Sequence, residues 1–165
     1  MFGSFFKTFS LGSRTISLAS PVRGKVIPLS EVKDQMFSCG LLGDGVAIEP
    51  TGTRVVAPAA GKVKAIFPTG HAVALHTDQD LDVLIHVGLD MVKLEGRYFK
   101  VHVSVGEHVE AGDVLIEFDA PAIVAAGYDI TIPVIVSNSA EFSSVRGNVG
   151  ADVEELQGLI VVRPR

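Results

Sequence analysis

Two histidines inside apolar, strand-like runs are the residues of this chain best suited to chemistry. The run "DVLIHVGLD" (82–90) places His86 among aliphatic residues that leave neither face of a strand free for water. A second run, "HAVALH" (71–76), begins with His71. The polar stretch "TDQD" (77–80) between these runs is typical of a turn, so the sequence predicts a β-hairpin that carries both histidines.

The length of that turn decides which residues of the hairpin face each other. A loop of two or four residues pairs His71 with His86 and Val73 with Leu84, whereas a loop of three or five residues breaks this pairing. Opposed residues on one face have Cβ atoms about 4.5 to 5.5 Å apart, close enough for two imidazoles to touch. We therefore predict a histidine pair on one face of the hairpin.

Two adjacent imidazoles in apolar surroundings hinder each other's protonation, which favours a use in chemistry over simple packing in the core. One use is a metal site with Asp90 as a third ligand, as in a zinc-dependent hydrolase. A second use is acid–base catalysis with one ring as base and one as acid. A third is covalent catalysis, in which one ring attacks while a backbone carbonyl holds its other nitrogen and the neighbouring ring donates a hydrogen bond.

The elements that must position this pair are predicted to be β-strands. Short apolar runs are separated about every 8 to 12 residues by Gly, Pro, Asp or Asn, with little helical periodicity. "SPVRGKVIPL" (20–29) resembles "APAAGKVKAI" (57–66), and a Gly-Asp step follows each copy, in "GDGVAI" (43–48) and "GDVLIEF" (112–118). The sequence thus predicts an all-β, antiparallel sandwich or barrel built by duplication, with the histidine hairpin as an insertion in the second copy.

Composition limits the class of protein. The 165 residues suit one domain, and a net charge of -5 with scattered Lys and Arg argues against nucleic-acid binding. The single Cys39 excludes an internal disulfide and fits a reducing compartment. No signal peptide or long apolar run is evident, so we expect a cytoplasmic protein, and Met1 favours a free-standing chain.

Residues 1–15 are expected to form a short amphipathic segment before a domain at 16–165. Four phenylalanines recur at helical spacing, namely Phe2, Phe5, Phe6 and Phe9. Such a stripe suits either weak contact of residues 2–11 with a membrane surface or docking on the domain's own surface.

The motifs together resemble a known family. "LIHVGLDMV", "FPTGHAVAL", "GDGVAIEPTG", "APAAGKV" and "FKVHVSVGEHVEAGDVLIEFD" are similar to the glucose-type IIA component of the bacterial phosphoenolpyruvate-dependent sugar phosphotransferase system, over residues 20–162. The resemblance implies a duplicated β-sandwich of the hybrid-motif type and a phosphoryl carrier that requires no cofactor. His86 would accept phosphate from the phosphohistidine carrier protein HPr and pass it to the IIB domain of a glucose-type sugar permease.

The resemblance also implies roles around His86. His71 would hold a phosphoryl oxygen through its ring N–H, Thr69 would orient His71, and the carbonyl of Gly88 would fix the tautomer of His86. Regulatory binding to transporters or enzymes, with zinc shared between two proteins at the histidine pair, would be an added role.

A partner-binding surface is implied as well. Its acidic members are Asp34 and Asp90. Its apolar members, called here the apolar rim, are Met36, Phe37, Leu41, Leu42, Phe67, Val73, Leu84 and Val92. The chain departs from the family pattern at Asp80, where Gly is common, and at Met91, where Thr is common. Asp80 lies in the turn on which the predicted pairing depends.

Overall fold

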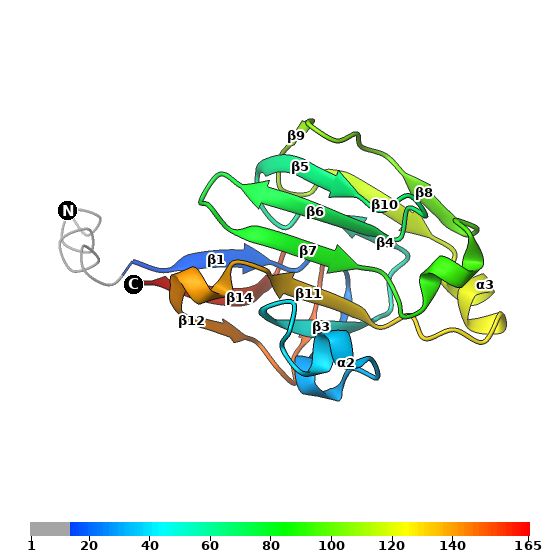
Figure 1. Ribbon diagram of the computed structural model, residues 1–165, viewed down its shortest axis with the longest axis horizontal. Coiled ribbons are helices and arrows are strands. Elements are labelled where there is room, and N and C mark those ends of the chain that lie inside the picture. Colours follow the sequence, from blue (N-terminus) through cyan, green and yellow to red (C-terminus); the bar gives the residue numbers. More distant parts are fainter. Residues whose placement is uncertain (1–13) are drawn as a thin grey trace.

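The computed structural model describes residues 14–165, whose regular secondary structure is mainly antiparallel β-strand (Figure 1). The strands are β1 (Ile16–Ala19), β2 (Gly24–Pro28), β3 (Asp44–Pro50), β4 (Arg54–Val56), β5 (Gly61–Ile66), β6 (Ala72–Thr77), β7 (Asp82–His86), β8 (Phe99–Val101), β9 (His108–Val109), β10 (Val114–Phe118), β11 (Ile132–Val136), β12 (Phe142–Gly147), β13 (Asp152–Val153) and β14 (Gly158–Pro164). The helices are short: α2 (Gln35–Ser38), α3 (Ala120–Ala125) and the 3-10 turns η1 (Leu29–Glu31), η2 (Met91–Leu94) and η3 (Ser139–Glu141). The predicted all-β fold with little helix is confirmed.

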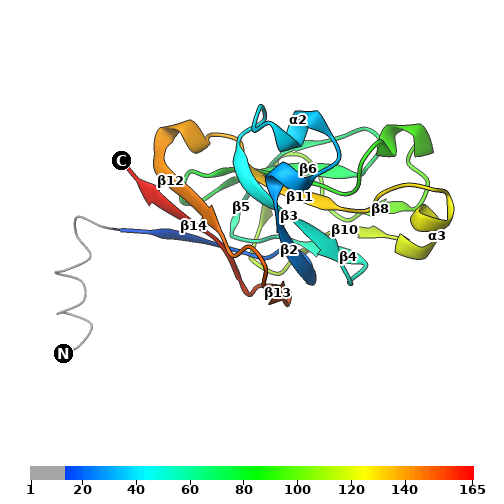
Figure 2. The same ribbon diagram turned by 90° about the horizontal axis from the view of Figure 1, so that it is seen from below.

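Three sheets enclose one main core. The largest has the strand order β13-β2-β3-β11-β7-β6-β5-β9, and two smaller sheets have the orders β1-β14-β12 and β4-β10-β8. The small sheets lie behind the central strands of the large one (Figures 1 and 2). Fully buried aliphatic residues from all three sheets, among them Ile85, Ile116 and Ile160, share the core between them. No helix in residues 14–165 is long and apolar enough to cross a membrane.

The duplication is more complete than the sequence repeat indicated. Strands β4 to β10 form one continuous copy, which is inserted between the third and fourth strands of the other copy, β1 to β3 and β11 to β14. Read inward from its two edges, the large sheet gives β13-β2-β3-β11 and β9-β5-β6-β7, and the small sheets correspond in the same way. The hairpin β6–β7 is therefore the counterpart of β3 and β11, which corrects its prediction as an insertion.

One half of the predicted repeat is right and the other half is wrong. Gly24 and Gly61 start equivalent strands, and at each a Cβ would lie 2.3 or 2.4 Å from a carbonyl oxygen of the neighbouring strand. The counterpart of "GDVLIEF" is 156–162, not 43–48: the amide of Gly112 donates to Ala57 O (2.9 Å), and that of Leu156 donates to Ser20 O (2.8 Å). Both have positive φ, +95° and +69°, so Leu156 occupies a conformation that usually selects glycine.

The predicted pairing of the hairpin is off by one residue. In the structure Ala72 faces His86, and Val73 faces Ile85. The reason is the turn: the amide of Thr77 donates to Leu81 O (2.9 Å), and Asp80 has φ of 66°. This is a three-residue loop whose last residue is left-handed, a common hairpin type for which Asp is tolerated.

Candidate functional site at the histidine pair

His71 and His86 lie together in spite of the shifted pairing. His86 ends β7 on the outer face of the large sheet, whereas His71 lies at a bend immediately before β6. The carbonyl of His71 accepts from the amide of Val87 (2.7 Å), which fixes the bend against the end of β7. The two ring centroids are 4.6 Å apart with planes at 77°. The expected contact between the rings thus exists, but the bend creates it rather than the strand pairing.

The hydrogen bond of His86 defines its tautomer. Its Nδ1 lies 2.8 Å from the carbonyl oxygen of Gly88. A carbonyl only accepts hydrogen bonds, so Nδ1 carries the proton and Nε2 of the neutral ring keeps a free lone pair. Burial lowers the pKa of His86, while the bond to Gly88 and the negative charge of Asp34 act in the opposite direction. The geometry provides a neutral nitrogen nucleophile at neutral pH.

Gly88 is held so that its carbonyl points at His86. Its φ is +76°, and its amide donates to Thr131 O (3.0 Å), while the amide of Leu89 donates to Asp129 O (2.9 Å). A Cβ on Gly88 would meet Met91 Cε at 2.8 Å and Asp129 O at 3.0 Å. The loop is therefore supported by contacts that the sequence interpretation missed. No local pattern links the segment 129–131 to Gly88, because the contact depends on how β11 passes beside β7.

Gly88→Ala is expected to lower the free energy of unfolding by about 2 to 4 kcal/mol, because it adds a left-handed side chain and a steric clash. The displaced carbonyl should also release Nδ1 of His86, so nitrogen NMR shifts should report a mixture of its tautomers. Gly40→Ala is the matched control, since Gly40 has the same φ of +76° with nothing within 4 Å of a Cβ. Equal losses of stability and an unchanged tautomer in both variants would refute the steric argument.

His71 is the second ring of the site and is only 1% exposed. Its Nδ1 lies 2.5 Å from the hydroxyl oxygen of Thr69, two residues earlier. Burial and, second, the neighbouring His86 lower the pKa of His71 to about 4. At neutral pH the ring is uncharged, and when the hydroxyl of Thr69 donates to Nδ1 the ring proton lies on Nε2.

Acid is expected to weaken the fold through His71. Its folded-state pKa of about 4 lies below the ordinary 6.5, so the neutral ring gives stability that is complete above pH 6.5 and is lost as the pH falls toward 4. The loss is about 2 kcal/mol between pH 7 and pH 5. Urea unfolding at pH 7 and pH 5 tests it: His71→Gln should lose less stability on acidification than the wild type. An equal loss in both proteins would contradict the assignment.

Aromatic side chains enclose the pair. The Phe67 ring meets both imidazoles edge-on, with centroids 5.3 Å from His71 and 5.8 Å from His86. Phe37, from α2, lies 5.0 Å from His86 on another side. Between Thr69 and Val92 the sequence has no Lys or Arg. The site is thus apolar and contains no permanent cation of its own in that stretch.

The apolar rim is only partly exposed. Met36, Leu41, Phe67 and Val92 are open to solvent, with Leu41 69% and Val92 64% exposed. Phe37 is 3% exposed because it packs with Ile135 under α2, so it supports the surface rather than forming it.

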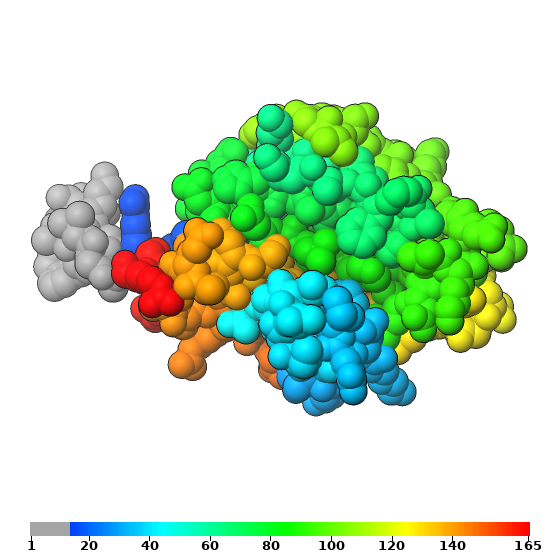
Figure 3. Space-filling model, viewed as in Figure 1, coloured from blue at the N-terminus to red at the C-terminus, as the bar shows by residue number. Residues whose placement is uncertain are grey.

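Val73, a predicted member of the rim, is fully buried. The one-residue shift in pairing turns its side chain to the core, and its inclusion in the partner-binding surface is wrong. Leu42 and Leu84 are partly buried and pack against the cluster beneath α2. In the space-filling view the segment containing α2 lies beside the hairpin strands on one face (Figure 3).

The two predicted acidic residues differ in their local roles. Asp34 caps α2 by accepting from the amide of Met36 (3.0 Å), and its charge acts on His86. Asp90 is exposed in a left-handed conformation, with φ of 60°. Within residues 14–165 no group of three or more His, Cys, Asp or Glu side chains converges on a metal position. The set His71, His86 and Asp90, predicted as the alternative zinc site, is not brought together as one.

The remaining three histidines contact carboxylates and lie outside the site formed by His71 and His86. His76 contacts Asp82 (2.6 Å) and Asp80 (3.1 Å), and His102 contacts Glu117 (2.5 Å). His108 contacts Asp78 and Glu110, each at 3.3 Å.

Similarity to known proteins assigns the protein family of this chain. The family model of the phosphoenolpyruvate-dependent sugar phosphotransferase system, EIIA 1, matches residues 16–142. The solved structure of glucose permease IIA from Mycoplasma capricolum superposes with a TM-score of 0.80 at 31% identity, over 90% of this chain and 96% of that one. The chain belongs to the EIIA 1 family of this phosphotransferase system.

The relatives of this chain include both single-domain and multidomain proteins. A glucose-specific EIIA component from Oceanobacillus iheyensis is 37% identical over 146 residues, which are 88% of this chain and 88% of that protein. A β-glucoside-specific EIIBCA component from Bacillus subtilis is 51% identical over 132 residues, 80% of this chain but 22% of that protein. The chain spans about a fifth of the length of such multidomain relatives.

Membership of the family makes this chain an EIIA component of a phosphoenolpyruvate-dependent sugar phosphotransferase system. The alternative prediction of a zinc-dependent hydrolase is not supported.

Proposed function

We propose that Nε2 of His86 accepts the phosphoryl group from HPr and passes it to a cysteine of a permease IIB domain. The observation that supports this most directly is the bond from Nδ1–H of His86 to the Gly88 carbonyl, which leaves Nε2 unprotonated. A ring held in the other tautomer would have its lone pair on the buried side and could not attack.

Atoms and electrons balance in the transfer of the phosphoryl group without a cofactor. The Nε2 lone pair of His86 forms the new N–P bond as the N–P bond to the histidine of HPr breaks, and the electron pair of that bond returns to the HPr imidazole. The phosphorylated ring of His86 becomes an imidazolium, and its Nδ1–H remains on the Gly88 carbonyl, which stabilises the positive charge. In the second transfer, a cysteine thiolate displaces Nε2 and the neutral ring is restored.

His71 and Thr69 are proposed to orient the phosphoryl group. His71 is uncharged because burial depresses its pKa, so it can donate one hydrogen bond without holding the phosphate as a cation would. The hydroxyl of Thr69 at Nδ1 leaves the Nε2–H of His71 directed to a phosphoryl oxygen. Neutral donors stabilise the group while it is bound and still permit its release.

The exposed rim is proposed to receive both partners in turn. Met36, Leu41, Phe67 and Val92 offer an apolar surface around the histidine pair, which suits successive partners of different shape. Asp34 and Asp90 would attract positive charge on each partner, and that charge would compensate the phosphoryl group during transfer.

The proposal also covers the bounds of the domain, the choice of sugar and further roles of the protein. We take 16–165 as the EIIA domain, because strands β12 to β14 complete the first copy of the duplication and follow the end of the family match at 142. Relatives are named for glucose, mannose and β-glucosides, so the permease rather than this domain would select the sugar. We further propose that the domain acts in the cytoplasm, binds regulatory targets, and shares zinc with a partner protein at His71 and His86. The predicted membrane contact of residues 2–11 lies outside the described residues.

The test is phosphorylation of the full chain by phosphoenolpyruvate, enzyme I and HPr. Intact mass should show one added phosphoryl group, which acid should remove and alkali should not. Nitrogen NMR of the labelled protein should place the phosphorus on Nε2 of His86. Absence of the added mass, or an acid-stable phosphate on a hydroxyl group, would overturn the proposal.

A further inference from the structure

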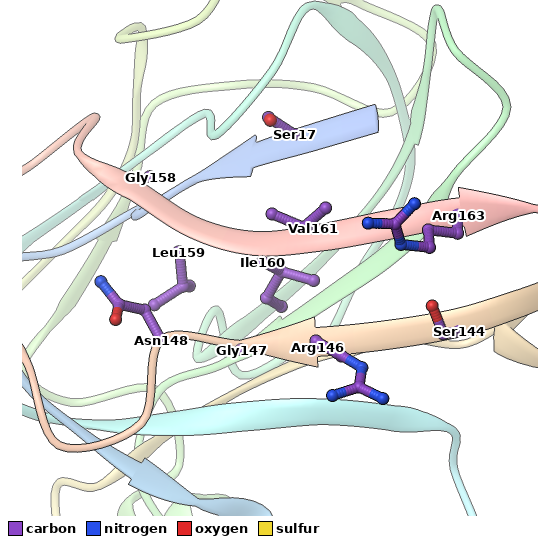
Figure 4. Close-up of a pocket in the computed structure, with 10 residues that line it drawn as sticks. All are labelled: Ser17, Ser144, Arg146, Gly147, Asn148, Gly158, Leu159, Ile160, Val161 and Arg163. Atoms are coloured by element: carbon purple, nitrogen blue, oxygen red, sulfur yellow. The ribbon is translucent and has the colours of Figure 1, made fainter. Parts of the chain in front are cut away.

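A cavity lined by neither histidine of the pair nor any residue of the apolar rim has no part in the proposed relay. It has a volume of about 470 Å³ and lies over the three-stranded sheet β1-β14-β12 (Figure 4). Side chains from each strand line it, including Ser17 from β1, Arg163 from β14 and Arg146 from β12. Cavities of this size are typical of sites for small ligands.

Strand pairing places two arginines close together in this cavity. Arg146 faces Val161 across β12 and β14, and Arg163 lies two residues further along β14, opposite Ser144. Diagonal neighbours of this kind have Cβ atoms about 7 to 8 Å apart, within the reach of two long side chains. Both residues are exposed, on the face of the sheet that points away from the core.

Neither guanidinium group has a compensating charge. Within residues 14–165 neither Arg146 nor Arg163 forms an ion pair or donates a side-chain hydrogen bond, whereas Arg54 is held by Glu155 at 2.9 Å. No Asp or Glu lines the cavity, and residues 1–13 contain neither. Two cations without a carboxylate partner among residues 14–165 therefore line one cavity in a chain whose net charge is -5.

The other polar groups of the cavity are neutral and can donate. The hydroxyls of Ser17 and Ser144, the amide of Asn148 and the apolar side chain of Val161 also line the cavity (Figure 4). Each guanidinium group can bind a phosphate through two parallel N–H bonds, and hydroxyls can donate to its remaining oxygens. We propose that this cavity binds the phosphate group of a phosphate ester, through Arg146 and Arg163.

The ester could be a free sugar phosphate or the headgroup of an anionic lipid, because both present the same phosphate chemistry. The two sources differ in whether the phosphate binds from solution.

Amide chemical shifts of the full chain, titrated at pH 7 and constant ionic strength, test the proposal. Glucose 6-phosphate is the free probe, and vesicles of phosphatidylglycerol with phosphatidylcholine are the lipid probe. Saturable shifts are expected at Ser17, Ser144, Gly147 and Val161, residues remote from the histidine pair. The affinity should fall at least about tenfold in Arg146→Ala and in Arg163→Ala.

Arg23→Ala is the matched control, because it removes one exposed arginine whose ion pair with Glu154 lies elsewhere. It should leave the affinity unchanged. A response to vesicles alone that requires both Arg146 and Arg163 would assign the phosphate to a lipid. The absence of saturable shifts with either probe, or equal losses in the control variant, would overturn the proposed site.

Discussion

His86→Gln is expected to abolish acceptance of phosphate from HPr. Glutamine has a similar reach but no ring nitrogen with a free lone pair, so no N–P bond can form. Removal of an essential nucleophile costs enzymes as much as about 10⁶-fold in rate, and here no second group replaces it. Intact-mass measurement after incubation with phosphoenolpyruvate, enzyme I and HPr should show no added phosphoryl group.

His76→Gln provides the matched control, since His76 is paired with Asp82 and Asp80 at the other end of the hairpin. It should be phosphorylated at the wild-type rate. A second readout shows that His86→Gln is folded: the pKa of His71 should rise from about 4, because the repulsion from His86 is removed while burial persists. Phosphate on the folded His86→Gln protein would identify another acceptor.

The sequence predicts that the rings of His71 and His86 touch, and they do so in the structure, although not through the predicted strand pairing. His86 was recognisable because it interrupts a run of aliphatic residues, and this depends only on residue type. The strand pairing of the hairpin depends on the turn. There Asp80 adopts a left-handed conformation, which the residue types of "TDQD" do not predict. Val73 was consequently assigned to the wrong face, while His71 reached His86 through a bend outside the regular pairing.

The duplication illustrates the same limit. Gly24 and Gly61 reveal equivalent strands, because at both positions only glycine fits against the neighbouring backbone. The equivalent of Gly112 is Leu156, whose left-handed backbone is invisible in the sequence, so the second half of the repeat was matched to the wrong segment. Support for Gly88 comes from Thr131 and Asp129, more than 40 residues along the chain. Such contacts follow from topology and not from local pattern.

His71→Gln is expected to slow the transfer to the IIB domain but not the transfer from HPr. Acceptance should proceed near the wild-type rate, because the attacking Nε2 of His86 is neutral and its tautomer depends on Gly88, not on His71. Onward transfer should fall by about 10² to 10³, the usual cost of removing one hydrogen bond from a reacting oxyanion. The thiolate of the IIB domain brings a negative charge toward the phosphoryl oxygens, so this step depends more on a donor at His71.

Separate rapid-quench experiments with HPr and with a IIB domain measure the rates of the two half-reactions. These rates show whether His71 acts in one step or in both. Thr69→Ala should give a smaller loss in the same step, because His71 keeps its buried position but loses the hydroxyl at Nδ1. Normal onward transfer in His71→Gln would show that the phosphoryl group is oriented without His71. Equal losses in both half-reactions would instead mean that His71 acts on the nucleophile through the 4.6 Å contact of the two rings.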